Sequence, residues 1–148
     1  MNDLDKLCLI LNTAATWYMV GLIWFVQLVH YPLFDGVGEK QFPEYARRHQ
    51  NWTTLAVGPP MLVEAATAVL LAFRLKNPLC WVGLVLLGII WASTALLQVP
   101  RHEELSTGFQ SKPYLFLVWS NWIRTIAWTL RGILTMTLVH LAMQPSSA

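Results

Sequence analysis

Histidine and glutamine recur together at the ends of two hydrophobic segments of this sequence. Gln27 and His30 are three residues apart, and Gln98 and His102 are four apart, so a helix would place each pair on one face. A third histidine, His49, lies in the polar stretch that follows the first segment. We therefore expect the three histidines to gather at one end of the folded chain, with His30 and His102 approaching each other.

These side chains are suited to holding a cofactor, and several interpretations stay open. Three histidine nitrogens with a nearby carboxylate suit iron, copper or zinc, which makes His30, His49 and His102 the candidate metal ligands. Two histidines on facing helices also suit the axial positions of a haem. Gln27 and Gln98 would then contact the cofactor. The alternatives are histidines that face lipid headgroups and a relay that carries protons.

Charged residues inside the hydrophobic segments form a second candidate group. Glu64 lies deep inside the second segment, and Arg124 and Arg131 lie in the last one. A charge in the hydrocarbon core costs about 3 kcal/mol, so we expect Glu64 to pair with Arg124 or Arg131. Asn121 shares a helical face with both arginines, because spacings of three and seven residues return to the same side. A structural ion pair and a catalytic site made of Glu64, Arg124 and Asn121 both remain open.

The elements that must position these residues are long hydrophobic helices. The chain has 148 residues, of which 55% are hydrophobic and 12% charged, and its mean hydropathy is +0.46. Soluble domains carry about 25% charged residues. Four segments reach the length of about 20 apolar residues that a membrane-crossing helix needs: 7–29, 52–73, 79–99 and 114–143. The sequence therefore predicts an all-α fold, a polytopic four-helix membrane bundle forming a single transmembrane domain over 1–148.

The links between these segments predict how the helices are arranged. Residues 30–51 and 100–113 are polar connections, and residues 74–78 form a tight turn. Four crossings then place both termini at one face of the membrane and the two longer connections at the other. Inside the second segment, the pair Pro59 and Pro60 removes two backbone donors, so this helix should bend or break.

An internal repeat relates the two halves of the chain. At one constant offset, Gly38 matches Gly108, Pro43 matches Pro113, and Asn51–Trp52 matches Asn121–Trp122. The matches favour a duplicated helical hairpin whose halves are related by an axis along the membrane normal.

Four short stretches resemble a set of uncharacterised four-helix bacterial integral membrane proteins. They are WFVQLVHYP at 24–32, PPMLVE at 59–64, QVPRH at 98–102 and NWIRT at 121–125. This resemblance implies the bacterial inner membrane as the location. The layout is more distantly similar to the anthrone-oxygenase-like family, in which a late helix carries an Asn-x-x-Arg element that Asn121 and Arg124 match. That resemblance implies oxidation of a polycyclic substrate at a membrane site.

Two classes of function follow from these features. The first is a membrane oxidoreductase or oxygenase-like enzyme, with iron, copper or haem as the candidate cofactor and a small hydrophobic molecule as the substrate. The second is a non-catalytic carrier or assembly subunit, in which the polar residues serve packing or line a transport path. The lipid bilayer is the expected partner, and a homo-oligomer remains open. A net charge of only +2, without a basic run beside aromatic residues, excludes nucleic acid.

Overall fold

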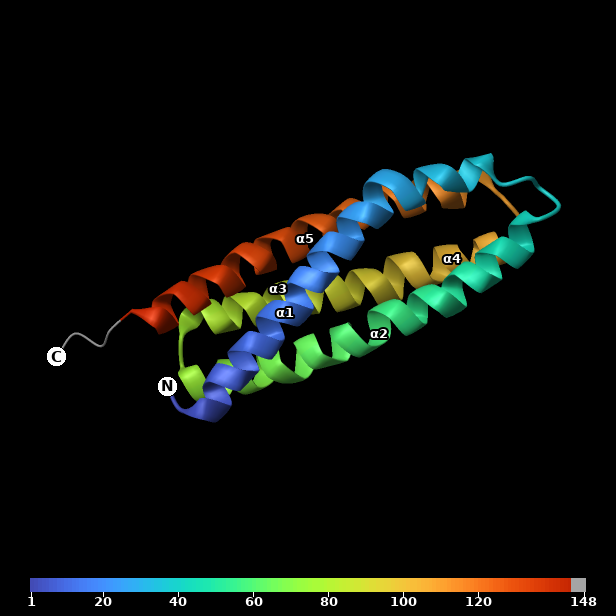
Figure 1. Cartoon of the computed structure of the whole chain (residues 1–148). Helices are drawn as coiled ribbons and strands as arrows, with labels where there is room; N and C mark the ends of the chain where they lie inside the picture. Colours follow the sequence, from blue (N-terminus) through green and yellow to red (C-terminus); the bar gives the residue numbers. More distant parts are fainter. Residues whose placement is uncertain (145–148) are drawn as a thin grey trace.

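Helices account for most of the chain in the computed structural model, which describes residues 1–144. They are α1 (Asp3–Phe25), the π-helix η1 (Val26–His30), the 3-10 helix η2 (Pro32–Gly36), α2 (Phe42–Leu75), α3 (Pro78–Ser93), the π-helix η3 (Thr94–Gln98), α4 (Val99–Ser106) and α5 (Ser111–Met143). No strand occurs in this part of the chain. The predicted all-α fold is confirmed (Figure 1).

Four helical runs are long and apolar enough to cross a membrane. They are Asp3–Gly36, Phe42–Leu75, Pro78–Ser106 and Ser111–Met143. Large apolar side chains cover their outer surfaces; Leu28, Val85 and Leu96, for example, are 60%, 64% and 72% exposed. An apolar exterior of this extent is expected where lipid replaces water around the protein. The chain is therefore built as a polytopic membrane protein.

The helices extend further than the hydrophobic segments alone indicate. The sequence predicts a polar connection over 30–51, but η2 and the first turns of α2 occupy most of it and leave residues 37–41 as the loop. Likewise, α4 continues the third helical run to Ser106, inside the predicted connection. Phe34 and Phe42 explain the first difference, because both side chains are fully buried against the neighbouring helices.

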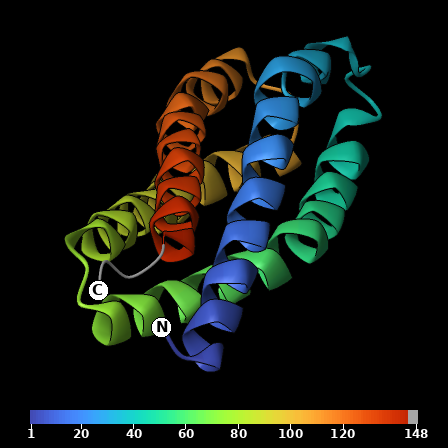
Figure 2. The same ribbon diagram turned by 60° about the vertical axis from the view of Figure 1, so that its left-hand side comes forward.

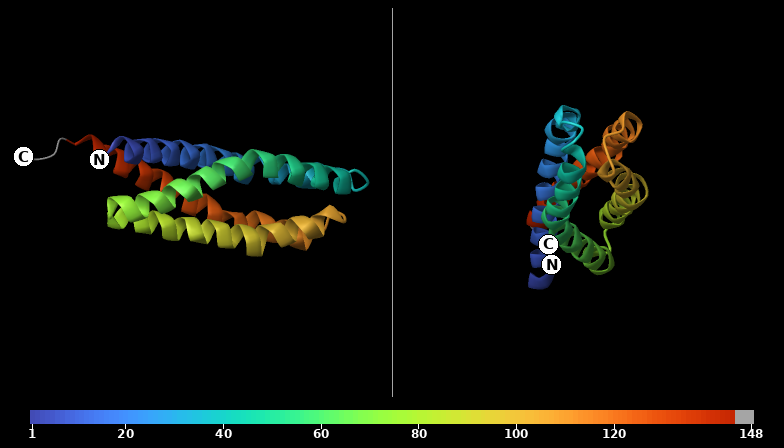
Figure 3. Two further views of the ribbon diagram at one scale, coloured as in Figure 1. Left: turned by 90° about the horizontal axis from the view of Figure 1, so that it is seen from below. Right: turned by 90° about the vertical axis from the view of Figure 1, so that its right-hand side faces the viewer.

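Both ends of the described chain lie at the same end of the bundle. Figures 1 and 3 show the start of α1 beside the last turns of α5, with residues 37–41 and 107–110 at the far end. The predicted tight turn joins α2 to α3. Lys76 adopts a left-handed conformation there, with φ 52°, and the side chain of Asn77 accepts the backbone N–H of Leu79 at 2.9 Å.

The two consecutive prolines of α2 bend this helix without ending it. Pro59 and Pro60 both lie inside the continuous range Phe42–Leu75, and Figure 2 shows the helix changing direction along its length. The sequence predicts that the prolines bend or break this helix, and in the structure they bend it. The bend separates the first half of α2, which approaches η1, from the second half, which packs beside the start of α1.

A tightly packed centre holds the four runs together. α1 packs against α2 and α5, and α5 also packs against α3. The close approach of α1 to α5 depends on Gly132, since a Cβ atom there would lie 3.2 Å from Cγ2 of Val20. Met19, Ile90 and Trp128 fill the middle of the bundle and are at most 1% exposed.

Short π-helical segments occur at corresponding places in the first and third helical runs. η1 contains Gln27, and η3 ends at Gln98. A π turn contains about one residue more than an α turn, so it changes the direction in which the following side chains point. Such turns are frequent at functional sites. Both glutamines are buried, at 4% and 2% exposed. The π segments therefore aim them into the bundle.

Candidate functional site

The first polar cluster is an ion pair in the middle of the bundle. Glu64 Oε1 lies 2.9 Å from Arg131 Nε, and both residues are at most 1% exposed. The predicted pairing of Glu64 with an arginine of the last helix is thereby confirmed for Arg131. Arg131 also donates to the carbonyl oxygen of Gly83 on α3. This pair joins α2, α3 and α5.

Neutral donors satisfy the rest of the Glu64 carboxylate. Thr16 Oγ1 donates to Oε1 at 2.8 Å, and Trp128 Nε1 donates to Oε2 at 3.1 Å. Asn12 Nδ2 donates to the Glu64 backbone oxygen at 3.0 Å and to Thr67 Oγ1 at 2.9 Å. Asn12 and Thr16 were not among the residues predicted from sequence, although their spacing places them on one face of α1. These contacts make the Glu64 cluster a packing element between helices.

Arg124 has a different environment, although it lies on the same face of α5. Its Nε donates to Asn121 Oδ1 at 2.9 Å, and its Nη2 donates to the same oxygen. Its Nη atoms also lie 3.4 Å from Thr94 Oγ1, from Gln98 Oε1 and from the Tyr31 hydroxyl. All of these partners are neutral. Across residues 1–144, none of the ion pairs includes Arg124.

The predicted amide residues hold Arg124 in place. Asn121 Nδ2 donates to Gln27 Oε1 at 2.8 Å, which turns Asn121 Oδ1 toward the arginine. Gln27 Nε2 in turn donates to the Val118 carbonyl oxygen at 3.3 Å. Gln98 Nε2 donates to Ser120 Oγ at 2.8 Å, and its Oε1 faces Arg124. Gln27, Gln98 and Asn121 therefore act together as a support for one guanidinium.

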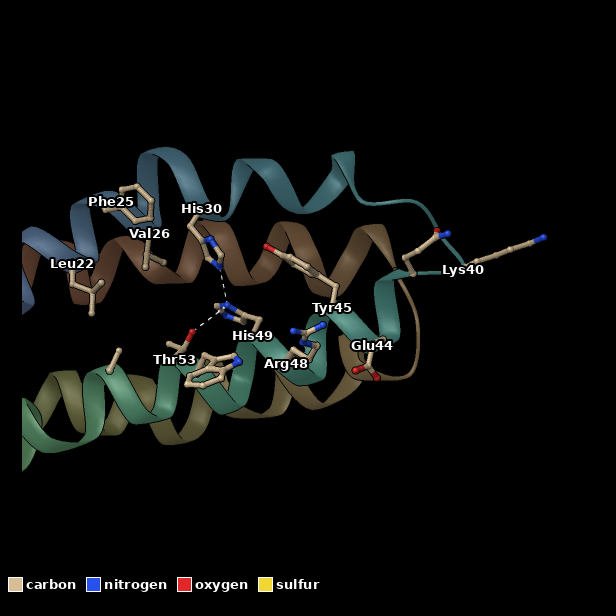
Figure 4. Close-up of a pocket in the computed structure, with 13 residues that line it drawn as sticks. Leu22, Phe25, Val26, His30, Lys40, Glu44, Tyr45, Arg48, His49 and Thr53 are labelled. Atoms are coloured by element: carbon tan, nitrogen blue, oxygen red, sulfur yellow. Dashed lines mark hydrogen bonds between the residues drawn. The ribbon is translucent and has the colours of Figure 1, made fainter.

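The three predicted histidines come together next to this support. His30 Nε2 lies 2.7 Å from His49 Nδ1, and the ring centroids of His49 and His102 are 5.2 Å apart. His49 thus stands between His30 and His102, which the sequence predicts to approach each other directly. The edge of Phe34 packs against all three imidazoles. Figure 4 shows His30 reaching from η1 toward His49 on α2.

Tyr31 is a member of the site that reasoning from the sequence missed. Its hydroxyl lies 3.1 Å from His102 Nε2 and 3.4 Å from Arg124 Nη2. A guanidinium only donates, so the Tyr31 oxygen accepts from Arg124 and its own proton goes to His102. Its position directly after His30 was the available signal, but an aromatic residue at a helix end is usually an interfacial anchor.

The histidine arrangement does not fit a directly bound metal ion. Two nitrogens bound to one metal stand roughly 3 Å or more apart, because each metal–nitrogen bond is about 2.0 Å long. The 2.7 Å between His30 Nε2 and His49 Nδ1 is the distance of a hydrogen bond instead. Within residues 1–144, no group of three or more His, Cys, Asp or Glu side chains is placed to hold a metal. The described geometry therefore does not support an iron or copper ion bound directly by these histidines.

A cavity of about 220 Å³, here called the inner cavity, lies beside Arg124. Its polar wall contains Tyr31, His49, Gln98, His102 and Arg124. Its apolar wall contains Met19, Leu22, Ile23, Val26, Val57, Met61, Val99 and Trp128. Glu64 is not part of either wall. Glu103 also lines the cavity, so a small molecule there would meet cationic, anionic and neutral polar groups at one end and hydrocarbon at the other.

A larger cleft of about 750 Å³, here called the outer cleft, opens between α1 and α2 (Figure 4). Four residues line both spaces: Leu22, Val26, His49 and Thr53. Thr53 Oγ1 lies 3.1 Å from His49 Nδ1, the same nitrogen that His30 Nε2 approaches, so two neighbours hold one edge of the His49 ring at the border. The two spaces therefore adjoin at His49.

The fold and these contacts define a polytopic four-helix membrane protein with a polar site inside its bundle. No protein-family model matches the sequence, and no curated protein or solved structure matches the chain.

Proposed function

We propose that this protein is a membrane enzyme that binds a small lipid-soluble molecule with an acidic hydroxyl group, such as a phenol or an enol, and removes its proton. The observation that carries the proposal is Arg124, which lines the inner cavity and has only neutral partners among residues 1–144. Arg124 is partly buried, and a cation partly shielded from water without a counter-ion is costly. An anion formed on the ligand would supply the missing charge.

The hydrogen bonds of Arg124 support an anionic ligand. Its contacts with Thr94, Gln98 and Tyr31 are each 3.4 Å long. Bonds from a guanidinium to a charged oxygen are shorter, about 2.7–2.9 Å, and roughly twice as strong as bonds between neutral groups. Nη2 also donates to Asn121 Oδ1, whereas the contact of Nη1 with Thr94 is long, so Nη1 would gain free energy by turning from this neutral acceptor to an oxyanion in the cavity. During this movement Asn121 holds the guanidinium in place, because its Oδ1 accepts from Arg124 Nε.

The paired histidines offer a path for the proton. Among the described residues, His49 uses Nδ1 for both of its hydrogen bonds, which leaves Nε2 for a ligand. The ligand hydroxyl gives its proton to His49 Nε2, and the Nδ1 proton passes to His30 Nε2 across 2.7 Å. His30 lines the outer cleft, so the proton leaves the inner cavity. The ligand stays behind as an anion beside Arg124.

Oxidation of the bound molecule is the further step that the family resemblance implies. A phenolate or enolate releases electrons more readily than its conjugate acid, so proton removal would prepare the substrate for oxidation. The oxidant would be a second reactant, such as molecular oxygen dissolved in the membrane. Arg124 and the polar side chains beside it would stabilise the phenolate or enolate that is then oxidised.

A carrier of the same acidic molecules is the second candidate function. The outer cleft favours it, because a route beside the inner cavity would let a ligand enter and leave unchanged. Incubation of a phenol with the protein under air, followed by product analysis, separates the two candidates. Conversion supports the enzyme, and recovery of the unchanged phenol after demonstrated binding supports the carrier.

The binding proposal is tested with 2-naphthol, whose neutral and ionised forms absorb at different wavelengths. Purified protein in detergent micelles should raise the ionised fraction of bound naphthol at neutral pH. Arg124→Gln should remove this effect, by roughly the factor of ten or more that loss of a charged hydrogen bond costs. Arg101→Gln is the matched control, since Arg101 pairs with Glu104 and lies outside both walls of the cavity. Equal ionisation in Arg124→Gln and the unsubstituted protein would refute the proposal.

A further inference from the structure

We infer that the natural ligand has a long apolar tail, which lies in the outer cleft between α1 and α2 while the acidic head lies beside Arg124 in the inner cavity. The inference rests on the proposed function for the head group and adds the chemical class of the remaining molecule. That class is a phenol or enol with a hydrocarbon chain, which would itself be a membrane lipid.

The sizes of the two spaces indicate a ligand whose head group and tail occupy different spaces. Cavities that enclose a whole drug-sized ligand measure roughly 300–1,000 Å³. The inner cavity, at about 220 Å³, is smaller than this range and accommodates a head group. The outer cleft, at about 750 Å³, is more than three times larger and has space for a chain.

The border between the spaces allows one molecule to occupy both. Leu22 and Val26 of the first helical run face His49 and Thr53 of α2 across it, and all four line both spaces. A chain that passes between them meets two aliphatic side chains and two polar ones. The polar pair is already hydrogen-bonded, Thr53 Oγ1 to His49 Nδ1, so an apolar chain leaves neither group unpaired.

The walls of the outer cleft show which way the tail runs. Figure 4 shows Leu22 and Val26 on one side of His49, and Tyr45 and Arg48 toward the loop on the other. Ala56 lies in the cleft one turn beyond Thr53 and is absent from the inner cavity. A hydrocarbon chain therefore follows the side of Leu22 and Ala56, toward the middle of the membrane, and avoids the charged rim.

Protection of a single cysteine in the outer cleft tests the inference. Cys8 and Cys80 are first replaced by alanine, and Ala56→Cys then reports on the cleft through its rate of reaction with N-ethylmaleimide. The ligands are 4-ethylphenol and 4-dodecylphenol, each added until it displaces the same fraction of bound 2-naphthol. Val85→Cys is the control, because Val85 is 64% exposed on α3 and lies in neither space.

At nine-tenths occupancy, 4-dodecylphenol should slow the labelling of Ala56→Cys about tenfold, and 4-ethylphenol should leave it nearly unchanged. Neither phenol should alter the labelling of Val85→Cys, and Arg124→Gln should abolish the protection. The inference is overturned if both phenols protect Ala56→Cys equally, if neither protects it, or if the protection survives Arg124→Gln. In each of these cases, displacement of 2-naphthol by the phenols would still support the head-group site. If neither phenol displaces 2-naphthol, the head-group site and the inference fail together.

Discussion

Arg124 and Arg131 lie two helical turns apart on one face of α5, and only Arg131 faces a carboxylate. Glu64 Oε1 lies 2.9 Å from Arg131 Nε, whereas Arg124 contacts amide, hydroxyl and phenol groups. The fold thus neutralises one buried cation and leaves the other beside the inner cavity. The difference is consistent with a role of Arg131 in the stability of the bundle and with the proposed role of Arg124 in binding a ligand.

Removal of Glu64 should destabilise the bundle strongly. Glu64→Ala leaves Arg131 buried without its counter-ion, which should lower the free energy of unfolding by about 3–5 kcal/mol. Glu104→Ala breaks only the partly exposed pair with Arg101 and should cost about 0–1 kcal/mol. Unfolding by a denaturing detergent, followed by circular dichroism in mixed micelles, measures both. Similar losses for the two variants would contradict a special role of the buried pair.

Two glycines should respond in opposite directions to the same substitution. Gly132→Ala brings a Cβ atom to 3.2 Å from Val20 Cγ2 and 3.4 Å from the Trp17 ring, so overpacking should cost about 1 kcal/mol or more. Gly21→Ala meets no atom within 4 Å and should stabilise α1 by roughly 0.5–1 kcal/mol. Thermal unfolding in micelles compares the variants. A neutral Gly132→Ala would show that α1 and α5 lie further apart.

An internal counter-ion should displace the ligand. Asn121→Asp places a carboxylate at the atom that already accepts from Arg124 Nε at 2.9 Å. Arg124 would then be neutralised within the protein, and the ionised fraction of 2-naphthol should fall to about a tenth, as in Arg124→Gln. Asn121→Ser separates the two effects of this change, because it also removes the amide contacts with Arg124 and Gln27 but adds no charge, so it should reduce the ionised fraction less than Asn121→Asp. Undiminished ionisation in Asn121→Asp would mean that the charge of Arg124 does not hold the ligand.

The two ends of the bundle should lie on opposite faces of the membrane. Gly38→Cys, in the loop after η2, and Lys76→Cys, in the turn before α3, are introduced separately after Cys8 and Cys80 have been replaced by alanine. A membrane-impermeant maleimide added to sealed vesicles should label one of these positions and reach the other only after the vesicles are opened. Labelling of both positions from the same side would refute the four-crossing topology.

Much of the architecture was predictable because it depends on local composition. The apolar segments are long enough to cross a bilayer, and this property alone predicts the all-α bundle, its four runs and the shared end of the termini. The face shared by Asn121, Arg124 and Arg131 also follows from spacing along one helix. The ends of the helices did not follow, because η2 and the start of α2 form on aromatic packing around Phe34.

The candidate site was predictable in its members but not in its connections. Gln27, His30, Gln98 and His102 stand out in the sequence because polar residues in an apolar segment need partners. Which partner each side chain contacts depends on the rotation of each helix about its axis. The π turns of η1 and η3 change that rotation, and the hydropathy pattern does not reveal them.

The sequence by itself determined that a membrane bundle must accommodate a carboxylate and two arginines inside its hydrophobic segments, with several histidines near their ends. Only the tertiary structure decided that Glu64 meets Arg131 and not Arg124, and that His49 stands between His30 and His102. The physical reason is that these contacts join residues on different helices. Their distances are set by the bend of α2 and the packing of α1 on α5, which no local pattern of residues records.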